Sequence, residues 1–169
     1  MTGAELLVDT FGRVREVVRE AVDGLSVDQL AARPDAEGNS VAWLVWHLTR
    51  VQDDHVGDAA GTEEVWTSQG WADRFALPLP ASDTGYGHGV DDVAAVRVDA
   101  GLLLGYHDAV CERTTAYVGG LSDDDFDRVV DEGWSPPVTL GVRLVSVVGD
   151  TLQHAGQAAF TRGIVERRA

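Results

Sequence analysis

The sequence contains a single cysteine, Cys111, among its 169 residues. An internal disulfide framework and a paired-cysteine zinc motif are therefore both excluded. Basic residues are also few, since 13 lysines and arginines face 28 aspartates and glutamates, and the formal net charge is −15. A chain with this charge repels a phosphate backbone, so we expect no nucleic-acid partner.

Long apolar runs are absent as well. No run approaches the roughly 20 apolar residues that a membrane-spanning helix needs, so we expect no membrane association. The first residues, 1–5, lack the basic start and apolar block of a signal peptide, which predicts a cytoplasmic location. No phosphate-binding glycine motif follows a strand, and no Gly-x-Ser-x-Gly nucleophile motif is present. These absences argue against nucleotide-dependent enzymes and serine hydrolases of the common types.

Apolar residues recur at helical spacing in four long segments, with almost no alternating strand pattern between them. The segments cover approximately residues 4–23, 39–60, 91–118 and 139–166. With 44% hydrophobic and 24% charged residues, the composition is that of an ordinary globular chain. We predict one all-α domain, residues 1–169, folded as a four-helix bundle, for which up-down-up-down is the simplest order.

The connection between the second and third helices, residues 61–89, is unusually long for a compact domain. A short helix is expected around residues 63–71, but the prolines and glycines that follow cannot continue it. The segment is rich in aromatic residues, among them Trp66 and Trp71, which is atypical of a solvated linker. We expect a flap packed over one end of the bundle, and its length leaves topologies other than up-down-up-down open.

His47 is the one polar residue in the apolar run Val41–Leu48. A buried imidazole needs partners for its nitrogens, because an unpaired buried polar group costs roughly 1–3 kcal/mol. On the last helix, Asp150 and His154 are four residues apart and therefore share one face. Two imidazoles, one carboxylate and a free fourth position are typical of a catalytic zinc site, and iron, nickel or manganese would also fit.

Plainer interpretations of these residues stay open. His47 could be a hydrogen-bonded core residue, and Asp150 and His154 could simply bond to each other. His55, eight residues after His47, could act as a general base beside a metal or could cap its helix. His107 is expected to pack in the bundle or point into it, and Asp53 and Asp54 are expected to be solvated.

The stretch Asn39–Leu48 together with Asp150–Gln157 resembles the DinB-like superfamily. More narrowly, it resembles the actinobacterial branch related to mycothiol-dependent maleylpyruvate isomerase and to mycothiol or bacillithiol S-transferases. The fragment His154-Ala155-Gly156-Gln157 is the most recognisable part. The resemblance implies a four-helix bundle that holds a divalent metal through His47, Asp150 and His154. Many members have histidine at the position of Asp150, although the isomerase branch has an acidic residue there.

The activity that the resemblance implies is S-transfer, in which mycothiol is joined through its sulfur to a second molecule. A metal-activated thiolate would attack a small electrophile, in a detoxification reaction. His55, Tyr86 or His88 would orient the substrate, and Arg50, Arg74 or Arg143 would meet a carboxylate.

Two other functions remain open at this point: a metal-dependent hydrolase that uses the same ion, and a non-catalytic module that binds metal or a protein partner. A homodimer through exposed helix faces is compatible with all three.

Overall fold

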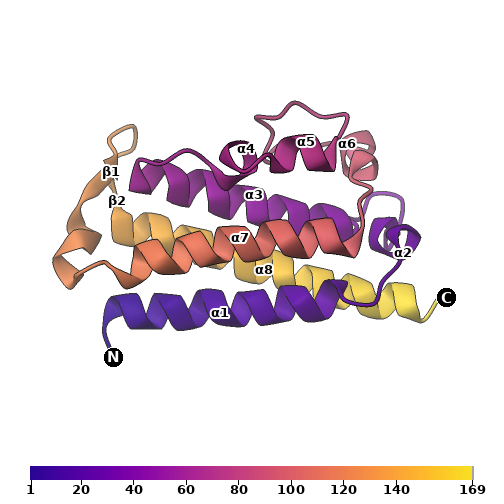
Figure 1. Ribbon diagram of the computed structural model, residues 1–169, viewed down its shortest axis with the longest axis horizontal. Helices are drawn as coiled ribbons and strands as arrows, with labels where there is room; N and C mark the ends of the chain where they lie inside the picture. Colours follow the sequence, from indigo (N-terminus) through magenta and orange to yellow (C-terminus); the bar gives the residue numbers. More distant parts are fainter. Residues whose placement is uncertain (169) are drawn as a thin grey trace.

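The computed structural model describes residues 1–168 and is built on four long helices (Figure 1). These are α1 (Gly3–Val22), α3 (Val41–Ala60), α7 (Ala100–Gly119) and α8 (Leu140–Glu166). Short elements connect them: α2 (Val27–Ala31), α4 (Val65–Ser68), α5 (Trp71–Phe75), α6 (Val90–Ala95), the 3-10 helix η1 (Asp123–Asp127), and the strands β1 (Val129–Asp131) and β2 (Val138–Thr139). The predicted all-α bundle is confirmed, with one small antiparallel strand pair added to it.

The order of the helices is not up-down-up-down. α3 and α7 lie side by side and run in the same direction, since Thr49 contacts His107 and, further along both helices, Gln52 contacts Thr114. α1 and α8 run opposite to this pair (Figure 1). α1 packs against both α7 and α8, and α8 packs most extensively against α3. The bundle is therefore up-down-down-up, which corrects the simplest expectation.

The long connection follows directly from this order. Because α3 and α7 are parallel neighbours, the chain must return along the length of the bundle between them, as in other bundles with a crossover connection. Residues 61–99 make this return and carry α4, α5 and α6. Trp66, Trp71 and Phe75 from this segment are buried in the main core. The segment thus lies along the side of the bundle and not over one end, as was expected, because it has to span the length of the two parallel helices (Figure 1). Its aromatic residues contribute to the core.

Helix ends follow the capping residues in the sequence. Ser40 and Thr139 are the N-caps of α3 and α8, and each accepts a hydrogen bond from the third residue of its helix. The third long helix begins later than predicted, at Ala100 rather than at Asp91. Asp99 caps it through the backbone N–H of Leu102 at 2.9 Å. Four non-helical residues, 96–99, separate it from α6, and the first of them, Val96, is fully buried.

Polar side chains are buried between α3 and α7. Thr49 donates to the carbonyl of Val45 at 2.7 Å and must therefore accept from Nδ1 of His107 at 3.0 Å. This leaves Nε2 of His107 unprotonated, and the thiol of Cys111 lies 3.4 Å from it. His107 is consequently held as a neutral imidazole, and burial lowers its pKa to about 4.

We expect His107 to make the stability of the protein depend on pH. Between the ordinary histidine value of 6.5 and the folded-state pKa of about 4, the unfolded chain binds more protons. The contribution of His107 is therefore intact above 6.5 and falls by about 3 kcal/mol as the pH decreases to 4. The free energy of unfolding, measured with urea at several pH values in this window, should depend less steeply on pH in His107→Gln than in the wild type. Equal slopes would contradict the assignment.

Asp53 is 2% exposed and not solvated, contrary to what the sequence predicts. Its carboxylate accepts hydrogen bonds from the backbone N–H groups of Val65 at 2.8 Å and Trp66 at 2.7 Å, and from the hydroxyl of Tyr106 at 2.9 Å. Asp53 therefore joins α3 to the first residues of α4 and to α7. Its neighbour Asp54 retains 42% side-chain exposure, in keeping with the original expectation.

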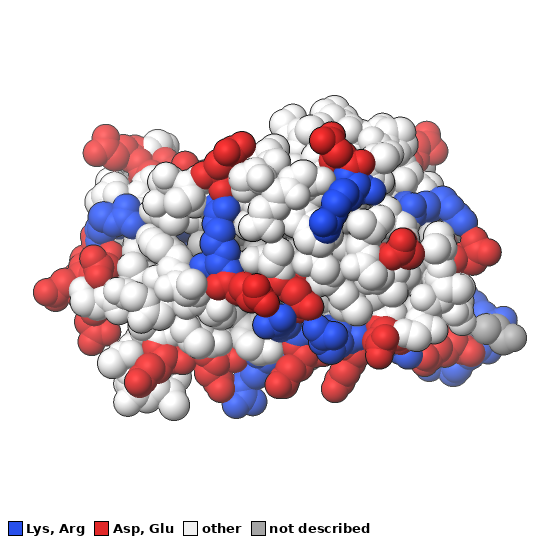
Figure 2. Space-filling view, in the orientation of Figure 1, with Lys and Arg blue, Asp and Glu red and all other residues white. Residues whose placement is uncertain are grey.

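The surface reflects the acidic composition. Figure 2 shows acidic side chains spread over one face, with arginines set among them along α1. Two of these arginines, Arg15 and Arg19, pair with Asp108 of α7. Within residues 1–168, no helix combines the length and apolar character that crossing a bilayer requires.

Candidate metal centre and adjoining pocket

The antiparallel packing of α3 against α8 places His47 opposite Asp150 and His154. Each residue offers one potential ligand atom, and these atoms all lie within 4.8 Å of one another. The imidazole rings of His47 and His154 have their centroids 4.8 Å apart, and Nε2 of His154 lies 3.5 Å from Oδ1 of Asp150. The second carboxylate oxygen of Asp150 is buried and has no hydrogen-bond partner among residues 1–168.

Hydrogen bonds on the outer side of both rings fix their tautomers. Nδ1 of His47 lies 2.5 Å from the carbonyl oxygen of Thr84, which can only accept, so Nδ1 carries the hydrogen. Nδ1 of His154 lies 3.0 Å from the amide oxygen of Gln157. In each ring Nε2 keeps its lone pair, which is the arrangement of metal-binding histidines.

Electrostatics act differently on the two imidazoles. Burial lowers the pKa of His47, against a smaller opposing effect of the Thr84 hydrogen bond, and so favours the neutral ring that a metal needs. The hydrogen bond with Asp150 raises the pKa of His154. The Asp150–His154 pair therefore attracts a positive charge, either a proton or a cation. The three residues fit a divalent metal in donor type, tautomer and spare acceptor capacity.

Residues 83–88 close over His47. Trp43 stacks on the imidazole with ring centroids 4.7 Å apart, and Tyr86 meets it edge-on at 5.6 Å. Gly85 has φ +101, a conformation that favours glycine, and a Cβ there would collide with the imidazole. The loop can approach His47 this closely only because position 85 has no side chain.

Gly85→Ala is expected to weaken metal binding by about 10–100-fold, the range typical of losing a partner that orients a metal-binding histidine. The added methyl group would displace the loop and with it the Thr84 carbonyl that orients His47. The measurement is a metal titration of the metal-stripped protein. Gly87→Ala is the matched control, because Gly87 also has a positive φ, of +75, but open space around its Cβ position. Equal losses in the two variants would mean that backbone strain alone is responsible.

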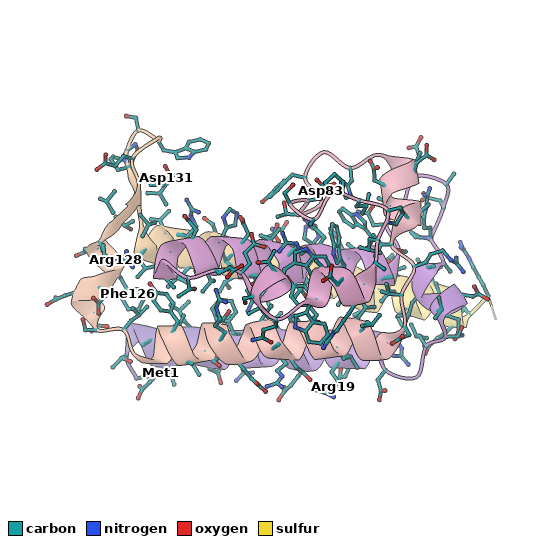
Figure 3. All side chains as sticks on the ribbon, turned by 45° about the horizontal axis from the view of Figure 1, so that its top comes forward. Met1, Arg19, Asp83, Phe126, Arg128 and Asp131 are labelled. Atoms are coloured by element: carbon teal, nitrogen blue, oxygen red, sulfur yellow. The ribbon has the colours of Figure 1, made fainter. Side chains whose placement is uncertain are left out.

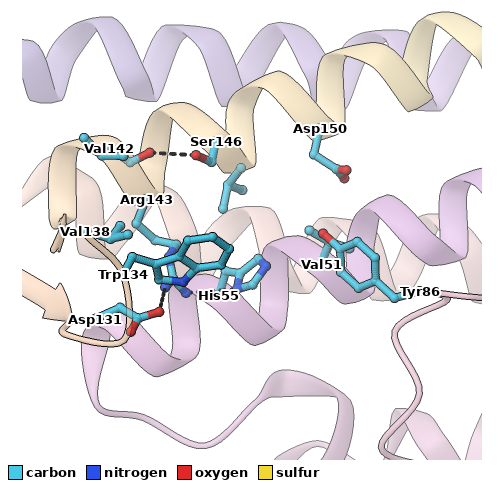
Figure 4. Close-up of a pocket in the computed structure, with 11 residues that line it drawn as sticks. Val51, His55, Tyr86, Asp131, Trp134, Val138, Val142, Arg143, Ser146 and Asp150 are labelled. Carbon is cyan, nitrogen blue, oxygen red and sulfur yellow. Dashed lines mark hydrogen bonds and ion pairs between the residues drawn. The ribbon is translucent and has the colours of Figure 1, made fainter. Parts of the chain in front are cut away.

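A cavity of about 430 Å³ reaches the candidate metal centre at Asp150, which is one of its lining residues. Figure 4 shows Asp150 and Tyr86 at one end and Trp134 and Asp131 at the other, with His55 between them. The walls come from α3, α8, the β1–β2 hairpin and the loop that carries Tyr86. The lining residues are Val51, His55, Tyr86, Asp131, Trp134, Val138, Val142, Arg143, Ser146, Val147 and Asp150. This volume is within the range of small-molecule sites.

His55 and Arg143 lie together in the wall of this cavity. Nη1 of Arg143 lies 3.1 Å from Nδ1 of His55, and Nη2 lies 3.1 Å from Asp131. Because the guanidinium can only donate, Nδ1 of His55 accepts and Nε2 carries its hydrogen. His55 therefore has a defined orientation near the candidate metal centre, and Arg143 is the arginine that the fold brings to the cavity.

The other predicted residues lie outside the cavity. His88 is 7% exposed in its side chain, accepts a hydrogen bond from the indole N–H of Trp43, and stacks on Trp46. Arg50 is fully buried, where it pairs with Glu64 and binds the carbonyl of Asp83. These residues support the loop over His47 rather than face a substrate.

Arg74 also lies away from the cavity, with its guanidinium 3.2 Å from the centre of the Trp71 ring. Sequence reasoning missed Asp131, Trp134 and Ser146, which line the cavity. Asp131 belongs to the β1–β2 hairpin, a projection separate from the one that carries Asp83 (Figure 3), and only the fold brings this hairpin to the cavity. The proline-containing connection has no periodic pattern, and the tryptophan within it is the one indication that the sequence offers.

Comparisons with known proteins agree with this architecture. The family model described as mycothiol-S-transferase matches residues 6–166. A solved structure described as the conserved protein of locus from Enterococcus faecalis is 33% identical, covers 99% of both chains and superposes with a TM-score of 0.92. No curated protein matches the chain.

Proposed function

Since the chain belongs to the mycothiol-S-transferase family, we propose that it is a divalent-metal-dependent enzyme that joins mycothiol, through its thiol sulfur, to a small electrophile. The observation that carries the proposal is the convergence of His47, Asp150 and His154, together with an open cavity that Asp150 lines at one end. Zinc is the preferred ion, with nickel, iron or manganese as alternatives for the same donors. Conjugation of reactive electrophiles would be a detoxification reaction.

The three residues would hold the ion through Nε2 of each imidazole and a carboxylate oxygen. When bound, a divalent ion lowers the pKa of a coordinating thiol, so that the thiolate exists at neutral pH. The remaining steps of substrate handling fall to groups of the chain. Thr84 and Gln157 hold the two imidazoles in the required tautomer, and Asp150 provides the negative charge that attracts a cation.

Residues along the cavity would orient the two substrates. Burial and the nearby carboxylates raise the pKa of Tyr86, so its phenol keeps its proton and can donate to sulfur or to a leaving group. His55, held by Arg143, presents its Nε2–H as a second donor. In the reaction, a carbon–sulfur bond forms as the bond to the leaving group breaks, and the thiol proton is released.

The test is consumption of purified mycothiol with model electrophiles such as a halonitroaromatic compound, before and after chelation and after readdition of each metal. We expect thiol-dependent conjugation that chelation removes and that one metal restores. No thiol consumption with any combination of several electrophiles and metals would overturn the proposal. Cleavage of an ester without thiol would favour a water-activating hydrolase instead.

A further inference from the structure

We propose that the cavity end formed by Trp134, Asp131 and Ser146 is a carbohydrate subsite that binds the sugar part of the thiol substrate. This inference rests on the proposed function, because it assigns the two ends of the cavity to the two ends of mycothiol. Mycothiol is an N-acetylcysteinyl amide of glucosaminyl-inositol. Its sulfur is therefore at one end of the molecule and a neutral, hydroxyl-rich pseudodisaccharide is at the other.

The aromatic part of the subsite is Trp134. It lies in the turn that joins β1 to β2, and 70% of its surface is exposed. Its indole is directed over the middle of the cavity, toward His55 (Figure 4). Exposed tryptophans of this kind are enriched at binding sites, since one face is apolar and the ring N–H can bond to a polar partner. The apolar C–H face of a pyranose or inositol ring is suited to stack on such an indole.

The polar part consists of groups that can bind hydroxyls. Asp131 offers a carboxylate that is held in place by Arg143 at 3.1 Å. Ser146 lies on the opposite wall, with its hydroxyl donated to the carbonyl of Val142 at 2.9 Å and its lone pairs free to accept. A planar carboxylate and guanidinium beside an aromatic ring provide acceptors and donors for adjacent ring hydroxyls.

The charge of the cavity favours a neutral thiol over an anionic one. Arg143 is the cation among the residues that line it, and its charge is balanced by Asp131 and, at 4.0 Å, by Asp58. Asp150 adds a further negative charge at the other end. A thiol whose far end carries carboxylates would meet these carboxylates without an unpaired cation. A polyol would meet only hydrogen-bonding groups.

The positions of the two ends also fit the orientation that the thiol substrate needs in the cavity. The candidate metal residue Asp150 and the aromatic Trp134 occupy opposite ends of the cavity (Figure 4). A thiol bound with its sulfur near Asp150 and its sugar under Trp134 would lie along the groove between α3 and α8. The apolar residues Val51, Val142 and Val147 would then line the space between.

The experiment compares mycothiol with N-acetylcysteine, which carries the same thiol without the sugar. For Trp134→Ala we expect KM for mycothiol to rise about tenfold, which is the loss expected for one stacked aromatic contact, while kinetics with N-acetylcysteine stay unchanged. Trp134→Phe should restore most of the affinity. Phe160→Ala is the matched control, because Phe160 is equally exposed, at 70%, but lies outside this cavity.

A binding measurement separates this inference from the proposed function. Sulfur-free N-acetylglucosaminyl-inositol, whose nitrogen is a neutral amide as in mycothiol, should bind the wild type and His47→Ala with equal affinity, and bind Trp134→Ala about tenfold more weakly. If no thiol is turned over but this binding pattern is found, the transferase proposal fails and the subsite stands. If mycothiol is turned over but Trp134→Ala affects both thiols equally, or neither, the subsite is refuted.

Discussion

Replacing His47 with alanine is expected to abolish stoichiometric metal binding and to lower the thiol-transfer rate by at least about a hundredfold. Loss of a group that merely orients a metal ligand already costs about 10–100-fold, and His47 is proposed as a ligand itself. It is also the one ligand contributed by α3, so its removal leaves only Asp150 and His154 on a single helix. Elemental analysis of the purified protein measures the first effect, and mycothiol consumption measures the second.

His154→Ala should behave in the same way as His47→Ala, because it removes the other imidazole. Gln153→Ala is the matched control: it is the adjacent, exposed residue of α8, and its amide bonds only to the carbonyl of Gly149. Retention of one metal per chain in both histidine variants would refute the assignment of the ligands. Retained metal with lost activity would instead place these histidines in substrate handling.

The second large effect is expected for Asp53→Ala, which should lower the free energy of unfolding by about 3–5 kcal/mol. Removing one partner of a buried charged network leaves the other groups without compensation. Here the backbone N–H groups of Val65 and Trp66 and the hydroxyl of Tyr106 would lose their acceptor, and the buried Arg50 would lose a nearby carboxylate at 3.9 Å. Urea unfolding monitored by circular dichroism at neutral pH gives the value.

Asp54→Ala is the comparison that isolates this effect, since Asp54 is the next residue of α3 and its side chain is 42% exposed. A surface substitution of this kind usually changes stability by less than about 0.5 kcal/mol. If the two variants lose similar amounts of stability, the hydrogen bonds of Asp53 contribute less than their burial indicates. Conversion of the transition to a non-cooperative one in Asp53→Ala would indicate that α4 has detached from the bundle.

Local features of the fold could be predicted from the sequence. Amphipathic spacing identified the long helices, and the capping residues Ser40 and Thr139 located two of their starts. The order of the helices in space could not be predicted, because helical periodicity does not specify whether the return from α3 to α7 crosses the bundle. Asp53 was misjudged for a related reason: its partners lie 12, 13 and 53 residues away in the chain.

In the candidate site, too, some features could be predicted from the sequence and others could not. Spacing predicted that Asp150 and His154 share a helix face, and their side chains lie 3.5 Å apart. The apolar surroundings predicted that His47 is buried, and it is 4% exposed. The role of Arg143 as the arginine of the cavity could not be selected over Arg50, because burial of Arg50 depends on Glu64 and Asp83 from the crossover segment. Trp134 lies in a turn without periodicity, so no pattern connected it to the cavity.

The elements that meet at His47 are contributed by three separate stretches of the chain, at positions 47, 84–86 and 150–154. Contacts between residues so distant in sequence form only when most of the topology is established, since closing long loops is entropically unfavourable. An ion that occupies this position would therefore bind the native state and not the denatured ensemble. By mass action, each tenfold excess of the ion over its dissociation constant would raise the free energy of unfolding by about 1.4 kcal/mol, and the thermal midpoint would rise with it.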